Sequence, residues 1–326
     1  MNVSSMSKFK AATGGQVEKQ YDVVALGEAM VEFNQSEAGA TAYRQGFGGD
    51  SSNVAIAARR QGARAAYLSR VGDDVFGRML LQLWRDEQVD ASHVALDPQA
   101  PTGLYFVAHG PDGHQFNYLR AGSAASRMRP DGMDFSALRQ ARWLHVSGIS
   151  QAISDSACDT VFAAIEAARA AGTQLSYDPN LRLRLWPLAR ARAIIEATIA
   201  VSDLFLPSFD EAVTLAGSAD IGAIFNWCFA HGARTVVLKC GADGAWHARS
   251  GDPAQHAAAI VVTPLDATGA GDCFDGSLLA RLAAGDALAD AVRYANASAA
   301  LSTLGHGAVA PIPHAATVLA RLNQPG

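Results

Sequence analysis

The strongest constraint on the fold is an alternation of short apolar runs with helix-like segments. In the second half of the chain it predicts strands at residues 143–146, 174–177, 203–206 and 235–239, separated by helices at 155–171, 189–200 and, as a pair, 210–231. Further strands at 21–27 and 65–70 are each followed by a predicted helix, at 54–61 and 75–88. The strands are too apolar for a sheet with one face in water. We therefore predict an α/β protein, with a mostly parallel sheet covered by helices on both faces.

A second, smaller sheet is predicted from the first half. Residues 102–108 and 115–120 flank Gly110-Pro111-Asp112-Gly113, which is a strong hairpin signal, and residues 42–47 alternate like an exposed strand. A small sheet cannot bury both faces alone, so it would cover a cleft or pair with a second subunit. We predict a disordered tail at 1–20 and one domain at 21–326, with lid strands inserted near 29–47 and 102–121.

Composition and charge exclude several classes of protein. The 326 residues are 49% hydrophobic, and 26 basic against 31 acidic residues give a net charge of −5, which argues against a nucleic-acid partner. No apolar run reaches the ~18–20 residues of a membrane span, and no signal peptide is evident, so we expect a cytoplasmic protein without a membrane partner. The cysteines and histidines are scattered, which argues against a zinc site and against disulfides.

Residues 266–276 combine a loop of small residues with an acidic side chain. Gly269-Ala270-Gly271 follows a β-rich apolar run at 258–262 and leads into a predicted helix at 273–282, so its backbone N–H groups could hold an anion. Asp272 would repel that anion unless it has a chemical task, such as general base for a hydroxyl that attacks a phosphoryl group. Taken alone, an N-terminal helix cap explains Asp272 equally well.

Two other segments are candidates for binding. Gly49 at a predicted helix start would let the backbone approach a polyol, with Asp50 and Asn53 offering hydrogen bonds, although a helix capped by Ser51 or Ser52 explains the pattern as well. The segment 239–244 could wall a nucleotide pocket, and a plain β-turn is the alternative. There is no P-loop motif, and no dinucleotide fingerprint follows the first strand, which disfavours P-loop enzymes and dehydrogenases.

Two motifs together resemble the signatures of the ribokinase-like (PfkB) carbohydrate kinases. They are Gly48-Gly49-Asp50-x-x-Asn53, continuing to Val71-Gly72-Asp73-Asp74-x-Phe76-Gly77, and Asp266-x-x-Gly269-Ala270-Gly271-Asp272. The resemblance extends from Tyr21 to about Pro313. It implies a ribokinase-like fold and the transfer of phosphate from ATP to a sugar hydroxyl, with Asp272 as the base. Gly269, Ala270 and Gly271 would form the anion hole for the transferring group.

The resemblance also implies cofactors and a nucleotide site. Magnesium would come with ATP, and Glu211 would help to hold it, through water; the asparagine that the family has three positions earlier is Ser208 here. The implied nucleotide-binding residues are Ser208, Lys239, Gly241, Gly244 and Asn296. A monovalent cation is a further possibility, but Gly305-His306-Gly307-Ala308 is too plain a sequence to assign one.

The segments around the sugar site look most like those of 2-keto-3-deoxygluconate kinases. Arg120 and Arg182 would suit the carboxylate of that sugar acid, with Tyr105 and Tyr118 as hydrogen-bond donors. Fructokinases also carry a lid arginine and an Asp-Pro-Asn-x-Arg segment, so a fructokinase or another ketose kinase is the alternative. A sugar-binding regulator without activity is a remote one, because it should carry a damaged base or anion loop. The exposed lid sheet predicts a homodimer with closed symmetry, or a higher oligomer.

Overall fold

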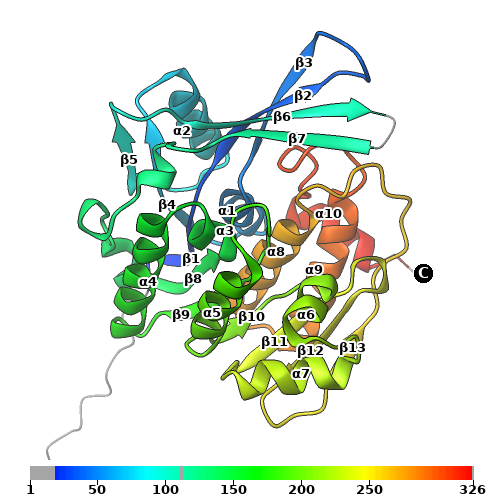
Figure 1. Ribbon diagram of the computed structural model, residues 1–326. Helices are drawn as coiled ribbons and strands as arrows, with labels where there is room; N and C mark the ends of the chain where they lie inside the picture. Colours follow the sequence, from blue (N-terminus) through cyan, green and yellow to red (C-terminus); the bar gives the residue numbers. More distant parts are fainter. Residues whose placement is uncertain (1–18, 111–112, 325–326) are drawn as a thin grey trace, which may run out of the picture.

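A nine-stranded sheet forms the body of the molecule (Figure 1), in the order β13-β12-β11-β10-β9-β8-β1-β4-β5. The computed structural model describes residues 19–110 and 113–324. The strands are β1 (Tyr21–Leu26), β4 (Ala65–Gly72), β5 (Val94–Asp97), β8 (Ala141–Ser147), β9 (Gln174–Asp178), β10 (Leu204–Phe205), β11 (Thr235–Lys239), β12 (Ala245–Arg249) and β13 (Gln255–Ala257). All neighbours from β5 to β11 are parallel, and β12 and β13 add an antiparallel edge. The predicted mostly parallel sheet is confirmed.

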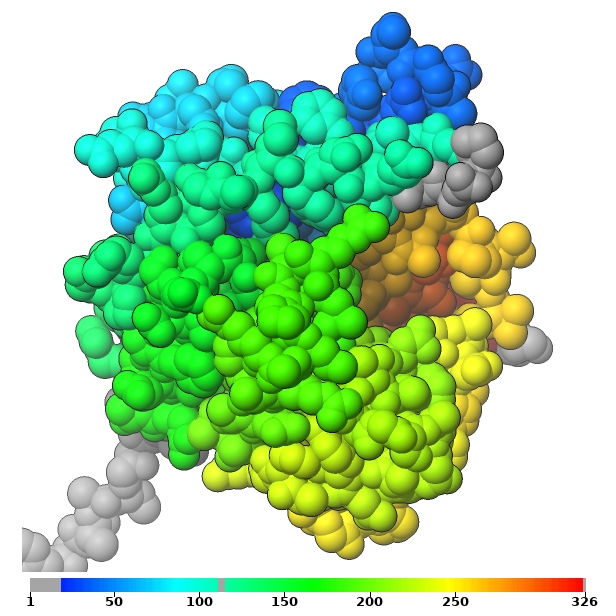
Figure 2. All heavy atoms as spheres, viewed as in Figure 1, coloured from blue at the N-terminus to red at the C-terminus, as the bar shows by residue number. Residues whose placement is uncertain are grey.

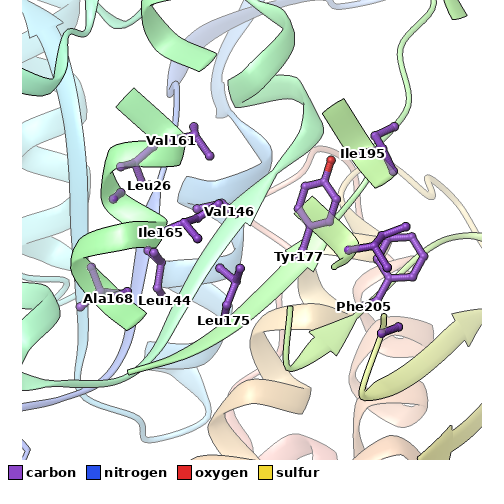
Figure 3. Packing of buried hydrophobic residues seen from close by; sticks show 14 of the residues in the cluster. Leu26, Leu144, Val146, Val161, Ile165, Ala168, Leu175, Tyr177, Ile195 and Phe205 are labelled. Atoms are coloured by element: carbon purple, nitrogen blue, oxygen red, sulfur yellow. The ribbon is translucent and has the colours of Figure 1, made fainter. Parts of the chain in front are cut away.

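Helices cover both faces of this sheet. They are α1 (Asp50–Arg60), α2 (Val75–Asp86), α3 (Gly148–Ala152), α4 (Asp155–Ala170), α5 (Leu188–Ile199), α6 (Phe209–Ala216), α7 (Ile221–Ala230), α8 (Ala270–Ala284), α9 (Leu288–Ser302) and α10 (Ala315–Leu322). Helices α4 to α7 share one apolar core with the strands, and α1, α8 and α9 share another. Figure 3 labels part of the first core: Leu26, Leu144, Val146, Val161, Ile165, Ala168, Leu175, Tyr177, Ile195 and Phe205. Burial on both faces explains why the strands are so uniformly apolar.

The smaller sheet, which we call the lid, has the order β3-β2-β6-β7. Its strands are β2 (Met30–Gln35), β3 (Tyr43–Gly48), β6 (Gly103–Gly110) and β7 (Gly113–Leu119), so the predicted hairpin forms, although residues 111–112 of its turn lie outside the described residues. One face packs on α2, where Phe33 meets Phe76 edge to face. The opposite face of the lid carries Glu32, Tyr105 and Tyr118, which lie side by side on neighbouring strands. Figure 2 shows the surface hollowed between the lid and the body, with C-terminal residues at the floor.

Two local predictions are wrong. Residues 258–262 form no strand, and the side chain of Val261 is 92% exposed. The first residue of β12, Ala245, already pairs with Ala257 in the antiparallel ladder. Residues after 257 therefore have no residue of β12 beside them. Helix α1 begins at Asp50 instead of residue 54, and neither Ser51 nor Ser52 caps it. The predicted tail at 1–20 falls almost wholly outside the described residues.

None of the described helices is by itself long and apolar enough to cross a membrane. Helices α6 and α7 reach that length and composition only as a pair, and they are bent by 66° at the break between them.

Helices α1 and α8 approach each other closely at Gly276. A β-carbon added there would lie 2.4 Å from the carbonyl oxygen of Val54 and 2.6 Å from the β-carbon of Ala57. Side chains at such spacing do not occur, so a larger residue would force the two helices apart. This matters for function because the active-site residues described below are at the N-terminal ends of these same helices.

We therefore expect Gly276→Ala to lower the free energy of unfolding by about 1–3 kcal/mol, as overpacking typically does, and to lower kcat as well. The control is Gly222→Ala in α7, where the nearest atom to an added β-carbon is an Asp220 side-chain oxygen at 3.3 Å. Thermal unfolding and steady-state rates measure both effects. A Gly276→Ala protein as stable and active as Gly222→Ala would contradict the close approach.

Candidate active site

Polar side chains collect where the parallel strands end. Ser147 ends β8, Asp178 ends β9 and Lys239 ends β11, while α1 and α8 begin at the same edge with Asp50 and Asp272 in their first turns. The carboxyl edge of an open parallel sheet is where ligands bind in such folds. The two segments predicted to bind sugar and phosphate, which lie far apart in sequence, therefore meet at one site.

The N-terminus of α8 is open to an anion. Gly269 occupies the cap position with φ 75°, and no side chain caps the helix. Asp266 stabilises the loop by accepting hydrogen bonds from the backbone of Thr268 at 2.9 Å and of Gly307 at 2.9 Å. Ala270 and Gly271 begin the helix, so their N–H groups lie at its positive end. The geometry leaves room for an anion here, and the anion hole stays a prediction.

Asp272 lies partly buried in the first turn of α8 and does not cap the helix, so the capping alternative is wrong. Its Oδ2 accepts a hydrogen bond from Asn53 Nδ2 at 2.8 Å, which joins α8 to α1. Burial and the neighbouring Asp50 carboxylate raise the pKa of Asp272 to about 8, against the opposing effect of the Asn53 hydrogen bond. A carboxylate with a pKa near neutrality is suited to accept a proton from a hydroxyl.

The start of α1 supplies the predicted polyol residues. Gly49 has φ 120°, and a β-carbon there would lie 2.4 Å from the carbonyl oxygen of Glu28, so only glycine fits. Asp50 is buried and accepts hydrogen bonds from Ser147 Oγ and, at 3.0 Å, from Asn180 Nδ2. Asn53 Oδ1 is buried without a hydrogen-bond partner among the described residues. A substrate hydroxyl could satisfy it.

The lid brings the predicted aromatic and cationic residues to the same cleft. Tyr105 donates a hydrogen bond to Glu32 and is 5% exposed, whereas Tyr118 is 47% exposed. Arg120, just after β7, forms an ion pair with the fully buried side chain of Glu28 and lies 5.7 Å from the Tyr118 ring centre. Its Nε has no hydrogen-bond partner among the described residues.

Arg182 has a different environment from Arg120. Its side chain is 54% exposed, and its Nη1 lies 3.5 Å from Glu211 Oε1. The Glu211 carboxylate also accepts backbone hydrogen bonds from Leu181 at 2.8 Å and from Ser208 at 3.0 Å, and with Ser208 it forms a capping box at the start of α6. Burial and Asp178 raise the pKa of Glu211. The structure therefore gives Ser208 and Glu211 a structural role besides any in binding.

The predicted nucleotide residues surround the end of β11. Lys239 Nζ contacts Asp178 Oδ2 at 2.9 Å and both oxygens of Asp275 at 3.1 Å. Gly241 begins a 3-10 turn and Gly244 follows it, both with positive φ. Asn296 Nδ2 donates to the carbonyl oxygen of Ala257 at 2.8 Å, which fixes the end of β13. Within the described part of the chain, no group of three His, Cys, Asp or Glu side chains is placed to hold a metal ion.

Comparison with known proteins identifies the family. A model of the "pfkB family carbohydrate kinase" matches residues 20–315, nearly the whole chain. The chain belongs to this family. It is therefore a sugar kinase, an enzyme that transfers a phosphate group from ATP to a carbohydrate.

The relatives of this pfkB kinase include more than one activity. A 2-dehydro-3-deoxygluconokinase of Thermoproteus tenax is 35% identical over 285 residues, covering 84% of this chain and 86% of the relative. Probable fructokinase-7 of Arabidopsis thaliana is 33% identical over 308 residues, covering 89% of each. The structure of a fructokinase double mutant from Vibrio cholerae O395, with fructose, ADP and potassium ion bound, superposes with a TM-score of 0.83 at 31% identity, covering 94% of this chain and 99% of that one. Identity alone does not select the sugar.

Sequence reasoning missed two residues of the candidate site. Glu28 follows the first strand, where the sequence shows only that a dinucleotide motif is absent, yet it pairs with Arg120. Asp275 lies one turn after Asp272 and contacts Lys239. The available signal was general: an acidic side chain in an otherwise apolar helix or strand end requires a partner when it is buried.

The raised pKa of Asp272 predicts the pH dependence of the reaction. Below about pH 8 most of the free enzyme would carry a protonated Asp272, which cannot accept a proton. We expect kcat/KM to rise with pH and to level off above about pH 8. Initial rates from about pH 6 to about pH 10, with ATP and magnesium saturating at each pH, measure the profile. A profile that is flat from about pH 6 upward would contradict this protonation state.

Proposed function

We propose that this pfkB kinase phosphorylates 2-keto-3-deoxygluconate, a sugar acid, with ATP. The observation that carries the proposal is Arg120, a nearly buried cation on the lid whose Nε has no partner among the described residues. It lies beside Tyr118 and above the site that holds Asp50 and Asp272. A buried guanidinium is the group best suited to recognise a carboxylate. The similarity to the Thermoproteus tenax relative supports the same substrate.

In the proposed mechanism the sugar lies between the lid and the start of α1. Asn53 Oδ1 and the Asp50 carboxylate accept hydrogen bonds from sugar hydroxyls, and Tyr105 lines the lid side. Asp272 takes the proton of the attacking hydroxyl as its oxygen bonds to the γ-phosphorus of ATP. The bond from that phosphorus to the bridging oxygen breaks, which yields ADP and a sugar phosphate. The N–H groups of residues 269–271 stabilise the charge on the transferring group.

The nucleotide would lie along the C-terminal half of the site. We place it near Ser208, Gly241, Gly244 and Asn296, which all lie around the ends of β11 and β13. Magnesium would enter with ATP and neutralise phosphate charge. The Glu211 carboxylate, which already accepts two backbone N–H groups, fits an outer role through water better than direct ligation. A monovalent cation is also part of this proposal, and rates with and without potassium test it.

Phosphorylation of fructose or another ketose is the second candidate. The observation that favours it is the ion pair between Arg120 and Glu28, which neutralises the cation before any substrate arrives. Further fructokinases of similar identity include those of Zea mays and Vibrio alginolyticus. An ATP assay with a panel of sugars and sugar acids, ranked by kcat/KM, tests both. A neutral ketose at the head of the ranking would overturn the sugar-acid proposal.

We propose further that the enzyme is a cytoplasmic homodimer that pairs through the lid. Exposed apolar side chains lie on both outer strands of the lid: Tyr43 and Leu119 are 44% and 62% exposed. An exposed sheet edge with apolar side chains commonly pairs with another chain. The molar mass in solution at micromolar concentration is the test. A monomer at that concentration would overturn the assembly without affecting the catalytic proposal.

A further inference from the structure

A buried ion-pair cluster lies directly behind the anion loop. Lys239, on β11, contacts Asp178, on β9, and Asp275, on α8. The side chains of Lys239 and Asp178 are 12% and 7% exposed, and that of Asp275 is fully buried. Burial alone would lower the pKa of Lys239, but the two carboxylates outweigh this effect and raise it. The ammonium group of Lys239 therefore stays charged, and the carboxyl groups beside it offset that charge.

The cluster touches the catalytic turn. A β-carbon added at Gly271 would lie 3.7 Å from Lys239 Nζ, so the ammonium group lies against the first turn of α8. The same turn carries Asp272, and Asp275 follows it by one turn of helix. An ammonium group has three N–H donors, and the two carboxylates occupy at least two of them. Lys239 is thus held in place by protein groups and has little capacity left to bind phosphate directly.

The cluster also connects to the sugar side of the site. Asp178 Oδ1 accepts a hydrogen bond from the backbone N–H of Asn180 at 2.9 Å, and Asn180 Nδ2 donates to Asp50 at 3.0 Å. Asn180 has φ 33°, in the left-handed region that few non-glycine residues occupy. A residue held there requires support from its surroundings. Asp178, held by Lys239, provides part of that support.

Stability alone does not explain such a cluster. Removing charges from water costs free energy, and apolar side chains of similar size often stabilise a protein as well as a buried ion pair does. A cluster that ties β9 and β11 to the first turns of α8, by contrast, holds the anion hole in place, so that its N–H groups need not reorganise during the reaction. The location of the cluster therefore indicates a role in the reaction.

We propose that Asp275 is a positioning residue for phosphoryl transfer, which together with Asp178 holds the Lys239 ammonium group beside Gly271. Lys239 then ties the anion loop at the start of α8 to β9 and β11, and Asp178 orients Asn180 toward Asp50. The inference rests on the proposed roles of Asp272 and the anion loop, and it is independent of which sugar is the substrate.

The test compares three variants with the wild type, using the sugar that the wild type phosphorylates fastest, so that an error in the substrate assignment does not affect the outcome. We expect Asp275→Asn to lower kcat about tenfold or more, with the KM for the sugar changed less than about threefold. Lys239→Met should lower both kcat and the melting temperature, because it leaves two buried carboxylates unpaired. In the double variant Lys239→Met/Asp275→Asn, only Asp178 is left without its cation, so the melting temperature should recover in part while kcat stays low.

The matched control is Asp286→Asn, which breaks the partly exposed ion pair with Arg281 at the other end of α8. Its kcat should equal that of the wild type. Two outcomes would overturn the proposal. One is an unchanged kcat in Asp275→Asn, and the other is a kcat that recovers together with the melting temperature in the double variant, since both would make the cluster purely structural.

Discussion

Asp272→Asn is expected to lower kcat by about 10²- to 10⁴-fold, the usual contribution of a general base. Asparagine has nearly the same shape and can still pair with Asn53, but it cannot take up the proton of the sugar hydroxyl. The KM for the sugar should change little, because Asp50 and Asn53 are intact. Sugar-dependent ADP production measures the rate, and calorimetry without ATP measures sugar binding.

The stability of Asp272→Asn provides the control. Because burial raises the pKa of Asp272 from 3.8 to about 8, the folded protein keeps a proton that the unfolded chain releases at lower pH. Asp272 therefore makes the free energy of unfolding fall as the pH rises between these two values. Asparagine has no such titration, so the variant should be at least as stable as the wild type above about pH 8. A variant that loses activity only because it unfolds or no longer binds sugar would contradict the role as base.

The raised pKa of Asp272 also indicates that the acidic groups of the active site lower the stability of the protein. An ionised Asp272 lies near Asp50 and Asp178, and each of these carboxylates raises its pKa. Such a concentration of buried acids lowers stability at neutral pH, and it persists where function requires it. A protein that had kept the fold and lost the chemistry would be expected to lose these acids, which is the physical argument against a regulator without activity.

The fold could be predicted because its main signals are local. The run 235–239 coincides with β11, and the hairpin signal around Gly110 lies between β6 and β7. Where a strand ends depends also on residues distant in sequence, because a strand needs a neighbouring strand to pair with. Residues 258–262 have the composition of a strand, yet no strand lies beside them, and no pattern within five residues reveals that.

The site could be predicted only in part, for a related reason. Asp272 and the glycines before it lie together in sequence and form a motif. The ion pairs of the candidate site join distant residues: Glu28 with Arg120, and Lys239 with Asp275. The sequence shows each charge, but only the folded chain shows which charge is buried and which partner it has.

Arg120→Met is expected to lower kcat/KM for 2-keto-3-deoxygluconate about ten- to a hundredfold, and for fructose much less. A lost hydrogen bond between charged groups at a buried site is worth roughly 1.5–3 kcal/mol, which corresponds to that range. A neutral ketose has no carboxylate that could pair with Arg120, so the substitution removes no such interaction. Rates with both substrates, measured on the same protein preparation, give the ratio directly.

Arg182→Ala is the matched comparison. The Arg182 side chain is 54% exposed, so water competes for it, and exposed ion pairs contribute only about 0–1 kcal/mol. Its effect on the sugar acid should therefore be smaller than that of Arg120→Met. Equal losses in both arginine variants would indicate that the lid arginine has no special role in recognising the carboxylate.

The difficulty with Arg120→Met is that it leaves the buried Glu28 carboxylate without its cation, which can destabilise a protein by about 3–5 kcal/mol. The double variant Glu28→Gln/Arg120→Met removes this effect, because no charge is left unpaired, and the glutamine that replaces Glu28 can still accept the hydrogen bond from Ser123. If the preference for the sugar acid stays lost in the double variant while the melting temperature recovers, Arg120 recognises the carboxylate. If the preference for the sugar acid returns together with the melting temperature, Arg120 only fixes the lid to the body, and other groups recognise the substrate.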